Sequence, residues 1–500
     1  MNNITFVKGK GGLGRPLPGK DYISGLVFYA SALPSGFSST SRIKQVFSVE
    51  EAEGLGIKSD FGDETRATGV YTISAVGATG DQIELQFAEP TKTVSLGTYV
   101  KTTSETTVTA VAAAIVSAIN ANTYIHGYTA ENTAGAITIT VRAGLGVWPN
   151  SGTRLTDVIT GTIAGSVTTA FSGGVASKQA VMHYHISEFF RLQPKGNLYV
   201  GIFAVPGSYT FEEVHTMQTF ANGDIRQIGV YVDSANYAAS QTTTLQSVAT
   251  TLDTLKMPLS ILYAANITSG TSISSLTDLS TYSNNKVSVV IAQDGASVGR
   301  SLFHATSKSI SALGAALGAV AFSNVQEDIA WVGKFNLSNG LELESIAFCN
   351  GETGLSQSAL DALDLKRYIF CRKFPNLAGT YFNDSHTAVT PTSDYAYIEN
   401  NRVIDKAIRG VDQALLPSLN SPLLLNTDGT LANSTIAFLE SQAVVITDNM
   451  VRNSEASAIS VTIDPNQDVA TTSEVVVTIN IVPVGVARNI VVNIGYKTSL

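Results

Sequence analysis

The segment Asn197-Leu-Tyr-Val-Gly-Ile-Phe-Ala204 decides the fold class, because it is a nearly unbroken run of apolar and β-prone residues. A helical pattern over residues 182–192 precedes it, and the same order of helix and then strand recurs twice downstream. Apolar strands that alternate with helices indicate a mixed or parallel sheet with helices on both faces. We therefore predict an α/β core with strands at residues 23–29, 197–204, 227–232, 259–264 and 287–292.

Between residues 65 and 174 the composition changes, since charges become sparse and Thr, Val, Ala and Gly dominate. Segments with apolar residues at every second position are typical of half-buried strands, and they lie at residues 70–76, 82–87 and 136–141. Residues 107–120 instead have helical spacing and predict one helix laid on that sheet. We predict a mostly β surface insertion domain, residues 65–174, that interrupts a core formed by residues 21–64 and 175–400.

The last hundred residues predict a small α+β domain, residues 401–500. Residues 402–416 form an amphipathic pattern that stops at Pro417, and its polar face shows Arg402, Asp405, Lys406, Arg409 and Asp412. A second helix is expected at residues 434–443, and three strands at residues 458–463, 475–482 and 489–496.

The first 20 residues are predicted to be an arm. A β-prone run, Ile4-Thr-Phe-Val7, is followed by 13 positions that hold five glycines and two prolines. Such a segment suits neither a helix nor a central strand. Strands at both ends of the chain are suited to pairing with the sheet edge of a neighbouring subunit, through main-chain hydrogen bonds.

Composition excludes several classes of protein. The 500 residues are 44% hydrophobic and only 14% charged, against roughly 25% charged in an ordinary domain, which argues against disorder. The net charge is −9 and no Lys/Arg-rich run is present, so direct binding of nucleic acid is not expected. The start of the chain lacks the pattern of a secretory signal, and no stretch is apolar enough for membrane insertion.

Two cysteines, Cys349 and Cys371, are too few for a disulfide framework or a zinc ribbon. We interpret both as buried or idle thiols of a protein made in a reducing cytoplasm. No cofactor is implied.

Several motifs resemble binding sites but are better explained by local structure. The segment Gly9-Lys-Gly-Gly-Leu-Gly14 matches a dinucleotide fingerprint, and residues 14–20 nearly match a phosphate loop, yet two prolines remove donors and a strand follows instead of a helix. His183 and His185 would chelate a metal from a strand, but their surroundings indicate a helix, where they point apart. Residues 464–468 open like a calcium loop and lack its later ligands, so a hairpin turn is expected.

An enzymatic alternative rests on Gly295-Ala-Ser-Val-Gly299, which matches the nucleophile-elbow pattern G-x-S-x-G. It follows a predicted strand, and His304, His386 and Asp384 lie downstream. The alternative is thus a virion-borne serine hydrolase or depolymerase that uses Ser297. Against it, Gln293-Asp-Gly295 intervene after the strand, so Ser297 does not stand directly at its end, and the next clear helix is expected only near Ser309. A third class, a passive surface-layer or adhesin module, predicts a secretion signal, which the sequence does not show.

The chain resembles the contractile tail sheath proteins of phages and related injection systems. The closing segment Ile481-Val-Pro-Val-Gly-Val-Ala-Arg-Asn-Ile-Val-Val-Asn-Ile494 is similar to the sheath C-terminal strand. Arg402-Val-Ile-Asp-Lys-Ala-Ile-Arg409 is similar to part of the family's C-terminal domain, and Ser309-Ile-Ser-Ala-Leu-Gly-Ala-Ala-Leu-Gly318 stands where sheaths carry a Gly- and Ala-rich helix. The predicted insertion resembles the domain that many sheaths display outward.

The resemblance implies a structural subunit, not an enzyme, that forms stacked hexameric rings around a tail tube and contracts to drive the tube through a cell envelope. Its expected partners are further copies of itself, the tail tube protein, and the baseplate and tail terminator proteins, in a virion assembled in a bacterial cytoplasm. Whether the machine is a phage tail, a bacteriocin or a secretion-type injector is left open.

The resemblance also implies site residues. The expected contacts of inter-subunit strand exchange are Ile4, Phe6, Ile490, Val492 and Ile494. Arg402, Lys406 and Arg409 are candidates for a contact with the tube. The alternative for these cations is a solvated helix face on which Asp405 pairs with Arg409.

Overall fold

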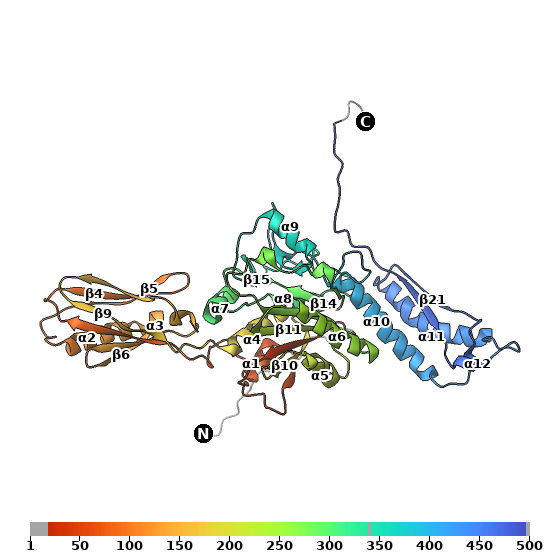
Figure 1. Ribbon diagram of the computed structural model, residues 1–500, viewed down its shortest axis with the longest axis horizontal. Helices are drawn as coiled ribbons and strands as arrows, with labels where there is room; N and C mark the ends of the chain where they lie inside the picture. The colour runs from red at the N-terminus through yellow and green to blue at the C-terminus, as the bar shows by residue number, and fades with distance from the viewer. Residues whose placement is uncertain (1–18, 339–341, 497–500) are drawn as a thin grey trace, which may run out of the picture.

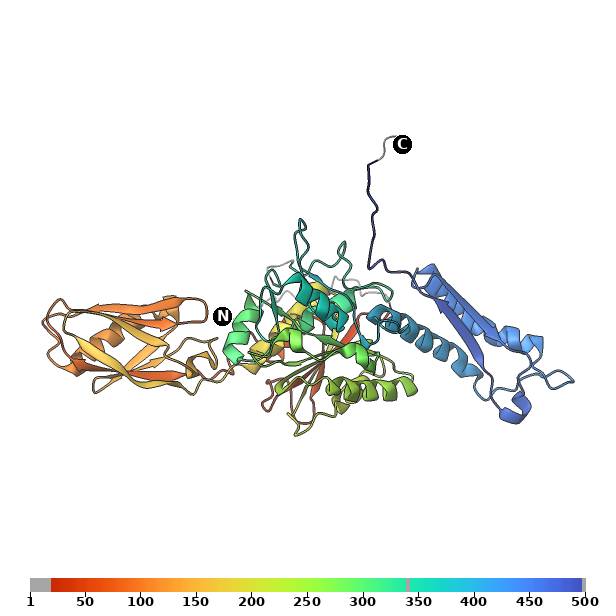
Figure 2. The ribbon, with the colours of Figure 1, turned by 45° about the horizontal axis from the view of Figure 1, so that its top comes forward.

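The computed structural model describes residues 19–338 and 342–496. They form a central α/β body, with a strand-rich lobe on one side and a helical hairpin with a small sheet on the other (Figure 1). The second view keeps the same order of the three parts (Figure 2). The N-terminal residues Ile4 and Phe6, and the glycine motif of residues 9–14, lie outside the described residues.

The central body is built on a mixed seven-stranded sheet, which confirms the predicted α/β core. Only the edge strand β2 is antiparallel to its neighbour. In spatial order the strands are β17 (Tyr368–Ile369), β14 (Val287–Val290), β12 (Ser260–Asn266), β11 (Gln227–Asn236), β1 (Ile23–Tyr29), β10 (Asn197–Phe203) and β2 (Ile43–Val46).

Helices cover both faces of this sheet (Figure 1). Every residue of β1 is buried, and successive side chains enter opposite cores: Leu26 and Phe28 join one cluster, Val27 and Tyr29 the other. One face carries α1 (Val49–Gly54), α4 (Lys178–Leu192) and α8 (Leu313–Phe322); the other carries α5 (Glu212–Phe220), α6 (Ser240–Thr254) and α9 (Gln357–Leu365).

The predicted strand at residues 287–292 is divided into two. After β14 the chain leaves the main sheet, and β15 (Ala292–Asp294) pairs with β16 (Ile346–Phe348). Helix α7 (Val298–Thr306) follows, so the expectation that the next helix begins near Ser309 is wrong. Short two-residue strands complete this body: β13 (Ser283–Asn284), β18 (Cys371–Arg372), β19 (Tyr381–Phe382) and β20 (Ala388–Val389).

Both cysteines are buried and free, as predicted. Burial raises the pKa of each thiol well above its usual range, so neither is a reactive thiolate at neutral pH.

Helices α4 and α8 approach closely because two glycines lie where they cross. A Cβ on Gly314 would collide with the backbone carbonyl of His185, and one on Gly318 would lie 2.7 Å from the carbonyl oxygen of Phe189. The spacing of glycines in Gly314-Ala-Ala-Leu-Gly318 predicts close helix packing, and the structure confirms it.

We predict that Gly314→Ala destabilises the protein by about 3 kcal/mol, since backbone of a packed helix cannot move aside as a side chain can. Urea unfolding checks this. The matched control is Gly54→Ala, where a new Cβ meets nothing within 4 Å and the change should be neutral or slightly stabilising. Equal stability of the two variants would contradict the prediction.

The strand-rich lobe has its own hydrophobic core and contains two sheets, where the sequence suggested one. Helix α2 (Val108–Ala121), capped by Thr107 as its sequence predicts, contacts strands of both sheets. One sheet has the order β6 (Thr129–Thr133), β7 (Ala136–Thr140), β3 (Thr68–Ala75), β9 (Ala164–Ser172); the other has β5 (Thr93–Val100), β4 (Gln82–Ala88), β8 (Leu155–Thr160).

The chain enters and leaves this lobe at one place. Thr65 and Val175 form an antiparallel bridge, so the two connections to the central body run side by side. A short helix, α3 (Thr123–His126), was not predicted.

The C-terminal part consists of α10 (Ile398–Leu415), α11 (Asn433–Arg452) and the antiparallel pair β21 (Ala458–Ile463) and β22 (Val477–Val482). The connection between these strands holds the short helix α12 (Val469–Thr472) in place of the simple hairpin turn expected after residue 464. Residues 489–496, predicted to be a strand, form no strand. Among the described residues, no helix is both long and apolar enough to span a membrane.

Candidate assembly site

The small sheet β21–β22 has two strands, so each strand has one paired and one unpaired edge. One face of the pair is half-buried against the helices, through Ile459, Ile481 and Ile463, while the alternate side chains are exposed. A two-stranded sheet is marginally stable alone, and an unpaired edge presents free N–H and C=O groups. The β21–β22 sheet therefore offers an unpaired edge to which a further strand can add.

A groove of about 400 Å³ lies beside β22. Its floor is apolar and comes from α10, through Ile404, Ala407, Ile408 and Val411, and its wall from Ile479 and Ile481 of β22. An added strand that points every second side chain toward α10 would fill this groove.

Large apolar side chains are exposed over the whole C-terminal part. They include Leu416 and Leu419 after α10, Phe438 and Val445 on α11, and Val482 at the end of β22. Each of these side chains leaves apolar surface in water, and burial against another protein would be favourable.

The C-terminal arm, residues 489–496, supplies side chains of the complementary kind. Ile490 and Val492 are 76% exposed and Ile494 is 95% exposed. The arm runs away from the β21–β22 sheet in both views (Figures 1 and 2). It has the alternation of a strand, but it pairs with no strand among the residues that the structure describes, so the predicted strand is absent here.

Arg402, Lys406 and Arg409 do not form the exposed charged face that helical periodicity predicted. Arg402 is only 4% exposed and donates to the hydroxyl of Ser323, at 2.6 Å. Lys406 Nζ lies 2.6 Å from carboxylate oxygens of both Asp21 and Glu455. Arg409 donates to the carbonyl of Pro258 at 3.0 Å. These cations join α10 to the central body, a role that helical periodicity does not reveal.

Asp405 also lies in this junction, and the expected pair with Arg409 is replaced by another. Its carboxylate binds Lys286, which precedes β14, and the two side chains are 2% and 6% exposed. Asp253 lies 3.8 Å from the same ammonium. Burial, with Asp405 nearby, raises the pKa of Asp253 although Lys286 opposes this. The junction thus combines buried ion pairs with apolar packing, since Val403 and Ala407 of α10 form one hydrophobic cluster with Val325 of the central body.

Ser297 is placed between β15 and α7, nearer to an elbow geometry than the sequence suggested, and the histidines of the hydrolase alternative lie elsewhere. His304 lies on α7 itself, about 10 Å further along the helix by its rise per residue. His386 instead bonds to Asp364 at 3.0 Å and lies against Tyr397, at the start of α10.

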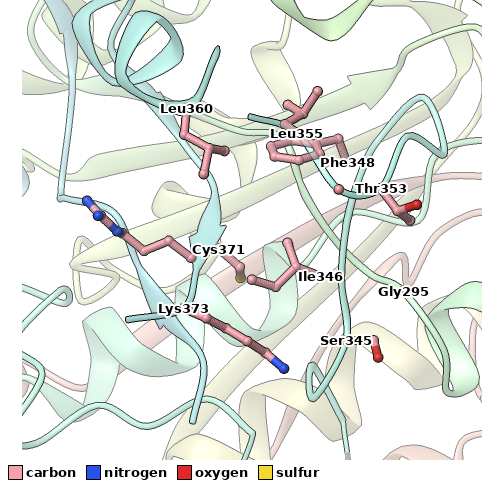
Figure 3. Close-up of a pocket in the computed structure, with 11 residues that line it drawn as sticks. Gly295, Ser345, Ile346, Phe348, Thr353, Leu355, Leu360, Cys371 and Lys373 are labelled. Atoms are coloured by element: carbon pink, nitrogen blue, oxygen red, sulfur yellow. The ribbon is translucent and has the colours of Figure 1, made fainter. Parts of the chain in front are cut away.

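The adjacent pocket also does not support hydrolysis (Figure 3). Its volume is about 470 Å³, and Gly295 and Ser345 lie on its wall. The side chains that Figure 3 labels are mostly apolar, and the cationic side chains of Arg372 and Lys373 also line the pocket. The described residues that line this pocket include no histidine to act as a general base for a serine nucleophile.

His183 and His185 point apart on α4, as predicted, and neither holds a metal in concert with the other. His183 bonds to Glu53 at 2.9 Å. His185 is fully buried against Tyr231 and Phe28, and neither ring nitrogen has a hydrogen-bond partner. Within the described ranges, no group of three or more His, Cys, Asp or Glu residues is arranged to hold a metal.

His185 predicts acid sensitivity. Burial lowers its pKa to about 3, from an ordinary value of 6.5. The unfolded chain binds a proton there below pH 6.5 while the folded chain does not, so stability is lost as the pH falls through this range. By pH 5 the loss is about 2 kcal/mol.

The measurement is urea unfolding of the protein and of His185→Leu at pH 7.5 and pH 5. The variant should lose less stability on acidification, by about this amount. Parallel losses in the two proteins would show that His185 is not responsible.

Two family models match the sequence: "DUF2586, N-terminal domain" over residues 1–386 and "DUF2586, C-terminal domain" over residues 394–500. The chain belongs to the DUF2586 family. The second match begins just before α10, so in this DUF2586 protein it contains the small sheet, the groove and the C-terminal arm. No curated protein matches the chain.

Three solved structures are similar in fold to this DUF2586 protein. A chain of the anti-feeding prophage (AFP) helical sheath in contracted state is 15% identical, with a TM-score of 0.46, and the match covers 63% of this chain and 81% of that one. A chain of the AFP baseplate is 13% identical, with a TM-score of 0.44 and coverages of 66% and 85%. A chain of the PVC sheath complex, an extracellular contractile injection system in contracted state, is 13% identical, with a TM-score of 0.42 and coverages of 63% and 80%.

Proposed function

We propose that this protein is the structural subunit of a contractile sheath, which polymerises as stacked hexameric rings around a tube and contracts to drive the tube through a cell envelope. The observation that carries the proposal is the pair of complementary features at the C-terminus. Within residues 19–338 and 342–496, the extended apolar arm pairs with no strand, and it does not occupy the sheet edge and apolar groove at β22.

In the proposed assembly, residues 489–496 of one subunit add to the free edge of β22 in a second copy. Ile490, Val492 and Ile494 share one face of an extended chain, because side chains two apart point the same way. That face would enter the groove over α10, where Ile404 and Ile408 lie. Main-chain hydrogen bonds would supply affinity and the groove would select the register. Ile4 and Phe6 are proposed to exchange in the same way.

Such an assembly would store work as a difference in inter-subunit packing between two arrangements, and this needs no cofactor. Subunit bodies rotate between two packings, while exchanged strands keep neighbours connected. Other copies, a tail tube protein, and baseplate and terminator proteins are the proposed partners, and a virion tail or a related injection particle is the proposed location. The low charge of the chain is consistent with surfaces covered by sister subunits.

A contact with the tube remains a prediction for Lys406 and Arg409, while Arg402 is buried. Arg409→Glu is the informative variant, because the Arg409 side chain donates to the carbonyl of Pro258 in this junction and not to a carboxylate. Reversal at Lys406 would also break the bonds to Asp21 and Glu455.

Negative-stain microscopy of the purified full-length protein tests the proposed function. Striated or ringed tubes are expected, alone or in the presence of the tube protein encoded with it. A protein that stays monomeric at high concentration with its tube protein present would refute the proposal. Esterase activity that is lost on Ser297→Ala would instead establish the hydrolase alternative.

A further inference from the structure

Arg488 lies at the point where the C-terminal arm leaves the folded protein. Its Nε donates to both carboxylate oxygens of Asp384, each at 3.0 Å, and its Nη2 donates to Asp328 at 3.2 Å and to Glu399. The guanidinium also stacks on Tyr397, 3.4 Å from the ring centroid. Beyond it, residues 489–496 are exposed.

The three carboxylates form a socket that suits a guanidinium. The side chains of Glu399, Asp328 and Asp384 are 3%, 7% and 12% exposed, so three carboxyl groups are withdrawn from water around one cation. Burial, with Glu399 and Asp384 beside it, raises the pKa of Asp328 well above its usual range. Burial lowers the pKa of Arg488, but the three carboxylates outweigh it and raise that pKa overall. Arg488 is thus the counter-ion that the socket requires.

Helix α10 also contacts the segment that leads into β1, at the N-terminal end of the core. Tyr397 is the N-cap of α10 and Glu399 lies in its first turn. Further along α10, Lys406 bonds to the carboxylate of Asp21, and Arg402 donates to the backbone carbonyl of Asp21 at 3.4 Å. Asp21 lies just before β1, where residues 1–20 join the core. The two attachment points fall within about 14 Å along one helix.

We propose that the first turns of α10 are a shared anchor for the roots of both arms, with the Asp328–Asp384–Glu399 socket holding Arg488 and with Arg402 and Lys406 holding Asp21. Arg488 then sets where the exchangeable C-terminal segment begins. The destination of the arms rests on the proposed function, whereas the anchor is a property of the single chain.

The anchor limits the length of the free arm. With Arg488 held, residues 489–500 can reach about 40 Å when extended; without it the free segment would begin after Val482 and reach about 60 Å. A longer, looser tether lowers the effective concentration of the arm at a neighbour's sheet. Because both roots lie on α10, a pull on one arm that tilts this helix also displaces the other root.

The test uses the unassembled full-length protein with spin labels at Ile490→Cys and Ser358→Cys, since both native cysteines are buried. Arg488→Met should broaden the measured distance distribution at least twofold. Arg452→Met removes an exposed arginine from the end of α11 and is the matched control, expected to leave the distribution unchanged. Because Arg488→Met leaves three carboxyl groups without a cation, a second variant adds Asp384→Asn and Glu399→Gln. This variant has no repulsion between these carboxylates, but it still lacks the anchor.

Hydrogen exchange near Asp21, at the root of the N-terminal arm, tests the shared role of α10. The amide of Ile23, bonded to the carbonyl of Lys20 at 3.0 Å, should exchange hydrogen several times faster in both Arg488 variants. An unchanged distance distribution would overturn the anchor, and a broadened distribution with unchanged exchange at Ile23 would overturn the coupling through α10. Both readouts are made on single chains, so a wild-type protein that forms no tubes would count against the proposed function alone.

Discussion

Removal of residues 489–500 should leave a folded, soluble monomer that forms no tubes. The arm side chains Ile490, Val492 and Ile494 are almost fully exposed, so their loss removes no packing from the subunit. The truncated chain keeps Arg488, so the three carboxyl groups around it keep their cation. The expected result is complete loss of assembly with an unchanged melting temperature, measured by light scattering, microscopy and thermal unfolding.

Point variants in the arm separate strand addition from a general stickiness of the terminus. Val492→Ser alters the face that would enter the groove, whereas Val491→Ser, equally exposed at 76%, alters the opposite face. Val492→Ser should shift the concentration needed for assembly several-fold, and Val491→Ser much less. Normal tubes from the truncated protein, or equal effects of the two point variants, would rule out the proposed exchange.

Lys286→Met should destabilise the protein by about 3–5 kcal/mol, because it leaves the buried carboxylate of Asp405 without its cation. Asp253 lies beside the same ammonium and would add its repulsion. Since Lys286 and Asp405 connect the central body to α10, the loss should appear as earlier release of the C-terminal part. Urea unfolding, followed by a probe on α11, measures it.

The double variant Lys286→Met with Asp405→Leu is the control. It replaces the ion pair with apolar groups, a change that is often neutral at buried sites. Most of the lost stability should therefore return. A single variant as stable as the wild type would show that the pair does not hold the junction, and a double variant as weak as the single one would show that packing, not charge, is responsible.

Where the sequence pattern is regular, it predicted the fold well. The apolar strands at residues 23–29 and 227–232 and the capped helix after Thr107 are found at those positions, because local periodicity and burial demand the same thing. Close packing at Gly314 was also predictable, since a helix without side-chain bulk can approach another backbone. The strands within residues 287–294 were harder to predict, because one apolar run contains strands of two different sheets.

The candidate site was predicted only in part. Alternation marked Ile490, Val492 and Ile494 as strand-forming, but a strand forms only beside an available edge, and no described strand of this chain pairs with the arm. Periodicity assigned Arg402 and Asp405 to a solvated face, because a helical wheel cannot show that a second body covers it.

Residue types and their spacing determine the order of apolar strands and helices in the core. They also determine the sparse charge and the strand-like alternation of the C-terminal arm. Which charges meet is decided by the tertiary structure alone. Arg488 and Asp384 are 104 residues apart, and Lys286 and Asp405 are 119 apart. Such pairs form only when folding removes both partners from water at one place, and spacing along the chain carries no record of that place.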